Sequence, residues 1–239
     1  MKILVLGDIH GRACWKSIIK KELPDLTVFL GDYVSSHEEI SAAEQIQNLE
    51  LILKYKEENM GNVILLRGNH DMQHLGYAWA QCSGYSPHVA AYMVKNKERF
   101  LSLTQWIYIK DNLLFSHAGI SKEWLKYYKI ENIDNINNIE PCETFAFTPC
   151  KFSDYQGTSA TQPCTWIRPS TLCEYAIEDY IQIVGHTPTR QIVEVQEYLK
   201  GFNVDQKSVC PIWLCDNLPE QYLVIDNNEF KVIDSEVFI

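Results

Sequence analysis

The sequence predicts an α/β domain, and three observations lead to this prediction. Short apolar runs of strand length alternate with longer amphipathic stretches through the first half of the chain, as in folds where helices cover a β-sheet. The length of 239 residues suits a single domain with a sizeable core. With 46% hydrophobic and 22% charged residues, the composition is that of an ordinary folded protein. We therefore expect residues 1–239 to form one domain.

The elements of the first half follow from apolar periodicity and from residues that end helices. Apolar runs predict strands at residues 2–6, 26–30 and 63–66. Helical spacing predicts a helix at residues 13–22, ended near Pro24, and a longer helix at 38–59 with Gly61 as its stop. The longer helix would begin with Glu38 and Glu39, since negative charge is favourable in a first turn.

The second half contains further helices, a hairpin and an irregular stretch. Helices are predicted at residues 73–81, 89–103 and 121–128, and strands at 181–184, 222–225 and 230–233. Asp111-Asn112, between apolar runs at 107–109 and 113–116, predicts a β-hairpin turn. Residues from about 131 to 165 show no clear period, and we interpret them as a loop-rich insertion or a cap over the functional site.

Composition and charge narrow the class of function. No apolar run approaches membrane-spanning length, and the chain enters its first strand without a secretory leader, so we expect a cytoplasmic protein with no membrane partner. The formal net charge of −10 disfavours nonspecific binding to nucleic acid, which requires clustered Lys and Arg. The eight cysteines are irregularly spaced and include no CxxC pair, so we expect buried or free thiols.

Five short motifs follow apolar runs of strand length. In chain order they are Gly7-Asp8-Ile9-His10-Gly11, Gly31-Asp32-Tyr33, Gly68-Asn69-His70-Asp71, Ser116-His117-Ala118-Gly119 and Gly185-His186-Thr187. Open α/β sheets bind ligands at the carboxyl ends of their strands. The motifs are therefore expected to bring six polar residues together, namely Asp8, His10, Asp32, Asn69, His117 and His186.

These six side chains offer oxygen and nitrogen ligands and no thiolate. Such a mixture suits Mn, Fe or Zn better than Ca or Mg. Six ligands are too many for one open catalytic ion, but they fit two ions that share a carboxylate. We therefore predict two divalent cations, with Mn preferred and Fe or Zn as alternatives.

The order of the five motifs resembles the calcineurin-like metallophosphoesterase superfamily, and most closely its phosphoprotein phosphatase branch. That branch also contains diadenosine tetraphosphate hydrolases. The resemblance spans roughly residues 2 to 190. It implies a four-layer α/β/β/α sandwich, in which helices flank two mixed β-sheets.

The resemblance also implies which residues bind metal. Asp8 and His10 would bind the first ion, and Asp32 would bridge both ions. The remaining ligands of the second ion would be Asn69, His117 and His186. A hydroxide held between the ions would attack phosphorus, because metal binding lowers the pKa of water.

Further residues would act on the substrate. The resemblance implies that His70 protonates the leaving oxygen as general acid and that Asp71 orients and charge-stabilises its imidazole. The usual GDxVDRG motif contains a phosphate-binding arginine, but this chain has Ser35-Ser36 at the positions of its DR, which argues against protein phosphatase activity of the usual kind. Trp166-Ile167-Arg168 resembles the tryptophan–x–arginine form of a second phosphate site in bacterial members. Arg168 is therefore the candidate for bidentate phosphate contact.

Three functions follow from these observations. The first is hydrolysis of a phosphomonoester, from a phosphoprotein, a nucleotide, a dinucleoside polyphosphate or another phosphorylated small molecule. The second is a phosphodiesterase or nuclease, whose branches usually end in GHxH where this chain has Gly185-His186-Thr187-Pro188. The third is a non-catalytic scaffold, although such relatives lose ligands or the acid histidine and this chain keeps them. We expect the first.

Other charged or aromatic residues have simpler structural interpretations. Arg67 precedes the third motif and is expected to form a structural salt bridge. His37, His74 and His88 lack the strand-end context of the motif histidines, so we expect them to be solvated or core side chains.

Overall fold

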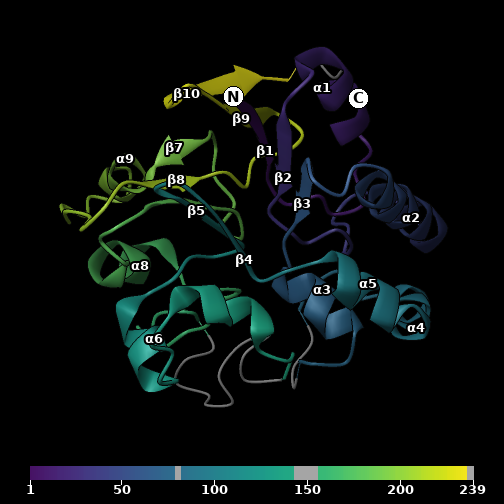
Figure 1. The fold of residues 1–239 in the computed structure, drawn as a ribbon, viewed down its shortest axis with the longest axis horizontal. Coiled ribbons are helices and arrows are strands. Elements are labelled where there is room, and N and C mark those ends of the chain that lie inside the picture. The colour runs from purple at the N-terminus through teal and green to yellow at the C-terminus, as the bar shows by residue number, and fades with distance from the viewer. Residues whose placement is uncertain (79–81, 143–155, 236–239) are drawn as a thin grey trace.

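A computed structural model describes residues 1–78, 82–142 and 156–235, and it shows two five-stranded β-sheets with helices on both outer faces (Figure 1). The first sheet has the strand order β10-β9-β1-β2-β3, and the second has the order β4-β5-β6-β8-β7. The strands of the first sheet are β1 (Lys2–Leu6), β2 (Leu26–Phe29), β3 (Val63–Leu65), β9 (Gln221–Asp226) and β10 (Glu229–Asp234). Those of the second are β4 (Ile107–Lys110), β5 (Leu113–Ser116), β6 (Ile181–Val184), β7 (Val193–Glu194) and β8 (Ile212–Leu214).

Both sheets are mixed, with a parallel centre and antiparallel strands outside it. In the first sheet β1, β2 and β3 run parallel, and β9 pairs antiparallel with β1. In the second sheet β5, β6 and β8 run parallel, and β4 and β7 are antiparallel edges. The carboxyl ends of three parallel strands therefore lie together in each sheet, and this places the loops that carry the motifs.

Side-chain alternation along the strands explains the two layers of core. Ile3 and Val5 of β1 belong to the cluster between the sheets, together with Phe115 and Ile183 from the second sheet. Leu4 and Leu6 point the other way and pack under the helices. Because successive side chains of a strand alternate faces, a strand covered on both faces is apolar throughout, as the sequence of β1 is.

Helices cover the outer face of each sheet (Figure 1). On the first sheet lie α1 (Trp15–Glu22) and α2 (Ala42–Glu58), and on the second lie α8 (Pro169–Tyr175) and α9 (Val195–Lys200). The remaining helices are α3 (Asn69–His74), α4 (Pro87–Lys95), α5 (Lys97–Leu103), α6 (Lys122–Tyr127) and the 3₁₀ helix η1 (Ile133–Asn138). The four-layer α/β/β/α arrangement is confirmed. No helix within the described residues is long and apolar enough to cross a bilayer.

Three predicted helices differ from those observed. The helix expected at 38–59 begins at Ala42, because Ser41 caps it, and Glu38 instead pairs with Arg12 at 2.6 Å. The helix expected at 73–81 was wrong: α3 spans Asn69–His74 and starts inside the third motif, while residues 79–81 lie outside the described residues. The helix expected at 89–103 is two helices, divided at Asn96, whose backbone is not helical.

The region expected to be an insertion or cap is only partly described. Residues 143–155 lie outside the described residues. In the flanking described parts, 131–142 and 156–165, η1 is accompanied by turns and irregular backbone. Gln156 nevertheless lines the cavity at the ends of the parallel strands. The cap therefore stays a prediction.

We expect Ser41→Ala to lower the free energy of unfolding by about 1 kcal/mol, because Ser41 and Glu44 form a reciprocal capping box at the start of α2. In a chain of this size that corresponds to a fall of about 2–4 °C in the thermal midpoint, measured by circular dichroism. Ser41→Thr retains the capping oxygen and the hydroxyl that donates to Glu44 Oε2, and is the matched control. Equal midpoints for Ser41→Ala and wild type would contradict the capping assignment.

Candidate metal centre

Residues of four of the five motifs line one cavity of about 700 Å³. The fourth motif reaches the same place through His117, whose Nε2 lies 2.9 Å from Asn69 Oδ1. Asp8 follows β1, Asp32 follows β2, Asn69 follows β3, and His117 and His186 follow β5 and β6. Both sheets therefore contribute side chains from the carboxyl ends of their parallel strands. The structure brings together all six residues that the sequence singled out as candidate ligands.

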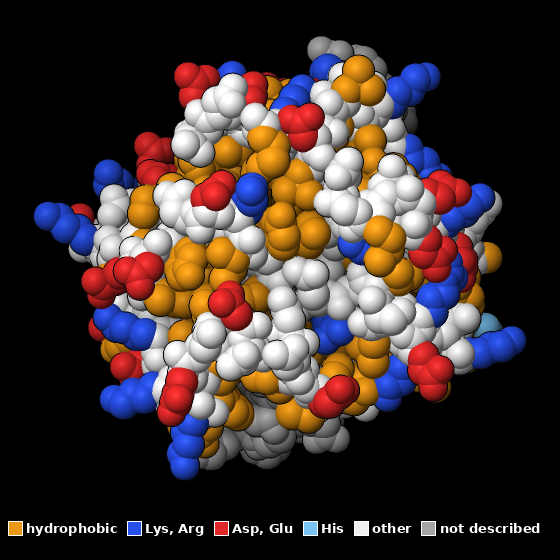
Figure 2. Space-filling view, in the orientation of Figure 1, with side chains coloured by type: hydrophobic (Ala, Val, Ile, Leu, Met, Phe, Trp, Pro, Cys, Tyr) orange, Lys and Arg blue, Asp and Glu red, His pale blue; other side chains and the backbone are white. Residues whose placement is uncertain are grey.

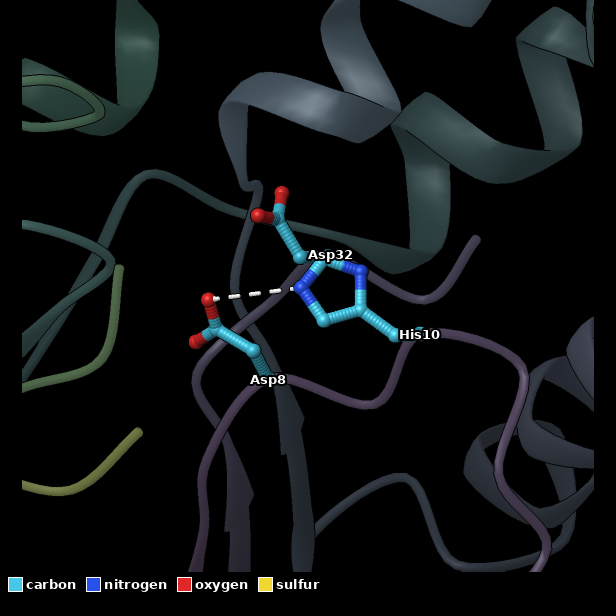
Figure 3. Close-up of side chains that lie close together, drawn as sticks. All are labelled: Asp8, His10 and Asp32. Carbon is cyan, nitrogen blue, oxygen red and sulfur yellow. Dashed lines mark ion pairs between the residues drawn. The ribbon is translucent and has the colours of Figure 1, made fainter. Parts of the chain in front are cut away.

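One half of the centre consists of Asp8, His10 and Asp32, which lie close together on the loops after β1 and β2; Asp8 and His10 face each other (Figure 3). One ligand atom from each lies within 4.8 Å of the others, and all three residues are buried. His10 Nε2 lies 4.0 Å from Asp8 Oδ2, and its Nδ1 lies 3.1 Å from the carbonyl oxygen of Val34. A carbonyl can only accept, so Nδ1 carries the hydrogen and Nε2 is left as a free ligand atom.

The other half consists of Asn69, His117 and His186. Asn69 Oδ1 lies 2.9 Å from His117 Nε2 and 2.9 Å from His186 Nδ1, so three donor atoms converge. His117 Nδ1 donates to the carbonyl of Leu30 at 2.8 Å. His186 Nε2 is buried and has no hydrogen-bond partner.

Asp32 joins the two halves. Its Oδ2 lies 3.4 Å from His117 Nε2 on one side, while its carboxylate belongs to the cluster with Asp8 and His10 on the other. Its Oδ1 accepts a hydrogen bond from the backbone N–H of His70 at 2.8 Å. Asp32 therefore occupies the position of a carboxylate shared between two cation sites.

The electrostatics of the cluster favour added positive charge. Burial disfavours the imidazolium of His117, but Asp32 and Asp8 outweigh burial and raise the pKa of His117 to about 10. Burial also favours the neutral acid at Asp32, but His117 and His70 hold the pKa of its carboxyl below the usual value. At Asp8, burial and then repulsion from Asp216 raise the pKa. A buried group of carboxylates on which imidazole nitrogens converge fits divalent cations.

The backbone reaches these positions through conformations that side chains seldom adopt. His10, Asp32 and His186 have φ values of 46°, 51° and 65°. Left-handed backbone at residues other than glycine costs free energy and is concentrated at functional sites. A Cβ on Gly185 would overlap Asp8 Oδ1, and a Cβ on Gly68 would overlap Asp32 Oδ1. Glycine at 68 and 185 is thus what lets the two carboxylates approach neighbouring loops.

Asp71 was predicted to orient the imidazole of His70, but it forms its hydrogen bonds elsewhere. Its Oδ2 accepts the backbone N–H groups of Asp32 and Gly68, each at 2.9 Å, and its Oδ1 accepts that of Tyr33 at 2.9 Å. With both oxygens occupied, Asp71 organises the loop that presents Asp32. Burial, then repulsion from Asp32, raises the pKa of Asp71 to about 8.

The two predicted substrate residues, His70 and Arg168, both line the cavity. His70 Nε2 lies 3.9 Å from Asp32 Oδ2. Arg168 Nη1 donates to the His186 carbonyl at 3.3 Å and to Thr187 Oγ1 at 3.2 Å, and its guanidinium lies over the Trp166 ring at 5.3 Å from the ring centroid. These contacts hold Arg168 in the cavity that the candidate metal ligands also line.

Sequence reasoning missed two residues at this site. Asp216 follows β8, is buried, lines the cavity and has its pKa raised to about 6 by burial and then by Asp32. Asp216 follows an apolar run, but no glycine precedes it as at the other motifs. The sequence does not show that its strand, β8, pairs with β6. His37 is solvent-exposed, as expected, but it also lines the cavity, with its ring centroid 5.2 Å from that of His10.

Arg67 is structural, as expected, although among the described residues it forms hydrogen bonds rather than a salt bridge. Its guanidinium donates to Thr104 Oγ1 and to the carbonyls of Leu101 and Thr104, and it lies over the ring of Trp106.

The cysteines in the described residues are free thiols. Burial raises the pKa of Cys14 to about 11 and that of Cys164 to about 12, so these thiols stay protonated.

Comparison with known proteins gives a family match and several fold matches. Residues 1–205 match the profile of the calcineurin-like phosphoesterases. A search of curated proteins finds no significant match.

Among solved structures, a cold-active protein-tyrosine phosphatase of a psychrophilic Shewanella species aligns with a TM-score of 0.62 at 16% identity, over 97% of this chain and 77% of that one. A Saccharomyces cerevisiae serine/threonine phosphatase with similarity to human PP5 gives 0.60 at 13% identity, over 100% and 81%. A metallophosphoesterase from Sphaerobacter thermophilus gives 0.50 at 14% identity, over 99% and 88%. At these identities the structures show that the fold is shared.

We expect Gly185→Ala to weaken Mn²⁺ binding about tenfold to a hundredfold, because the added methyl group displaces the Asp8 carboxylate. Isothermal titration calorimetry on the metal-free protein measures this dissociation constant. Gly61→Ala is the matched control, since a Cβ there meets no atom within 4 Å. If both variants bind Mn²⁺ as wild type does, Asp8 is not a ligand.

Proposed function

Because this chain belongs to the calcineurin-like phosphoesterase family, we propose that it is a two-metal phosphomonoesterase of the phosphoprotein phosphatase branch. The membership makes it a phosphoesterase; the monoester preference and the branch are the proposal. One observation supports it most strongly: Asp32 lies between two groups of donor atoms, within reach of His117 on one side and of Asp8 and His10 on the other. A single metal site would need no such shared carboxylate.

The donor set fits two divalent cations, with Mn preferred and Fe or Zn as alternatives. The residues that would hold them are Asp8, His10, Asp32, Asn69, His117 and His186. When bound, such ions lower the pKa of water and neutralise charge on phosphoryl oxygens.

The chain's own residues would bind the phosphoryl group and assist the leaving group. Arg168 presents a guanidinium that can contact two phosphate oxygens at once. His70 also lines the cavity, with its Nε2 3.9 Å from Asp32 Oδ2, where its N–H can donate to the leaving oxygen. Asp71 keeps the backbone of the Asp32 loop in place.

The names of structural relatives and the charge of the protein favour one class of substrate over nucleic acid. That class is a phosphorylated protein residue, nucleotide, dinucleoside polyphosphate or similar small molecule. Two structural relatives are named as protein phosphatases, one acting on tyrosine and one on serine/threonine. The chain carries a net charge of −10. On the face seen in Figure 2, Lys and Arg side chains are scattered among Asp and Glu. Such a surface gives a polyanion little electrostatic attraction.

We expect hydrolysis of p-nitrophenyl phosphate with added Mn²⁺, loss of activity with a chelator, and recovery when the metal is restored. His70→Asn should lower kcat/KM for phenyl phosphate by about 10²–10⁴-fold, and for p-nitrophenyl phosphate by less, while leaving metal binding intact. Faster hydrolysis of bis-p-nitrophenyl phosphate than of the monoester would identify a phosphodiesterase instead. A folded, metal-loaded protein inactive on p-nitrophenyl phosphate, phosphopeptides and dinucleoside polyphosphates would support a scaffold.

We expect Arg168→Ala to raise KM for the phosphomonoester, because a charged hydrogen bond to phosphate contributes about 1.5–3 kcal/mol. This corresponds to a change in KM of about tenfold to a hundredfold. Arg168→Lys should recover only part of the affinity, since an ammonium group cannot form the bidentate contact. Steady-state kinetics measure both; a wild-type KM in Arg168→Ala would remove Arg168 from the phosphate site.

A further inference from the structure

The side chain of Gln73 lies directly behind the imidazole of His70, three residues along α3 on the same helix face. Gln73 is 5% exposed. Its Nε2 lies 3.2 Å from His70 Nδ1 and 3.3 Å from Ser35 Oγ, and its Oε1 accepts the backbone N–H of Cys82 at 2.7 Å. The contact with Cys82 fixes the orientation of the amide, because a backbone N–H can only be matched by the amide oxygen.

The direction of the hydrogen bond to His70 follows from this orientation. An amide nitrogen donates and does not accept, so His70 Nδ1 must be the acceptor. The hydrogen of the neutral imidazole then lies on Nε2, the nitrogen that faces Asp32 Oδ2 at 3.9 Å in the cavity. The His70 backbone is held at the same time, because its N–H donates to Asp32 Oδ1 and its carbonyl lies 2.8 Å from His74 Nδ1.

We propose that Gln73 is the positioning residue of His70: it fixes the neutral imidazole with its hydrogen on Nε2, where this N–H stabilises the departing oxygen by a hydrogen bond, and the proton that the oxygen finally takes up comes from water. The inference rests on the proposed phosphomonoesterase function. Two other residues are excluded from this role by their contacts. Both oxygens of Asp71 accept backbone N–H groups. Ser35, where the GDxVDRG pattern has its second aspartate, accepts a hydrogen bond from Gln73 and forms none with His70.

The role of Gln73 has a kinetic signature. A donor to the leaving oxygen contributes most when that oxygen develops much negative charge, as with phenolate, and least when the charge is delocalised, as with p-nitrophenolate. The fall in kcat/KM on removal of the Gln73 amide should therefore depend on the leaving group. A general loosening of the site would lower the hydrolysis of both esters equally.

The test combines kinetics with a structural measurement that does not require metal. Gln73→Met keeps the bulk and removes the amide, and we expect its kcat/KM to fall about tenfold or more for phenyl phosphate and several-fold less for p-nitrophenyl phosphate. Ser35→Gly is the matched control, because it removes the hydroxyl beside Gln73, suits the φ of 69° at this position, and leaves the amide in place. It should show neither change.

Nitrogen-15 NMR of the metal-free protein reports which ring nitrogen of His70 carries the hydrogen. Wild type is expected to show hydrogen on Nε2. Gln73→Glu retains an oxygen for the Cys82 N–H but offers His70 only an acceptor, so Nδ1 should gain a hydrogen. Wild-type His70 with hydrogen on Nδ1 alone, or equal losses for both esters in Gln73→Met, would overturn the proposal. A wild type inactive on all phosphomonoesters would refute the proposed function, while the NMR result still decides the role of Gln73.

Discussion

The arrangement of the site depends on how the chain holds one carboxylate, that of Asp32. Its Oδ1 accepts the His70 backbone N–H, its own N–H donates to Asp71, and its Oδ2 is left to face His117. Three loops are therefore joined through a single buried acid. The neighbouring imidazole of His117 stabilises its negative charge, which burial alone would penalise. With this carboxylate fixed, the remaining donors have a common point on which to converge.

The two sheets divide the work of placing these donors. Asp8, Asp32 and Asn69 follow strands β1, β2 and β3, and His117 and His186 follow β5 and β6. Their parallel direction results from crossover connections that return the chain to the same edge. The apolar faces between the sheets fix their relative position, so the distance between donors from opposite sheets is set by core packing.

The sequence was most informative where chemistry and local backbone coincide. Glycine-marked strand ends identified all six candidate ligands, because the tight turn and the ligand lie next to each other in sequence. It was least informative about partners in space. Nothing local shows that Asp71 turns to the backbone of the Asp32 loop while Gln73 reaches His70. Asp216 was missed because its strand becomes a neighbour of β6 only through tertiary pairing. The start of α2 was misplaced because the acidic pair Glu38-Glu39 was interpreted as its first turn, although Ser41 is the residue that caps the helix.

The origin of the donors in both sheets has a consequence for stability. A cation held by Asp32 and Asn69 from the first sheet and by His117 and His186 from the second would link the two layers of the sandwich. Ions that bind only the folded chain stabilise it by mass action. The stability of the contact between the two sheets would then depend on the metal concentration. A shortage of metal would destabilise the fold as well as abolish catalysis.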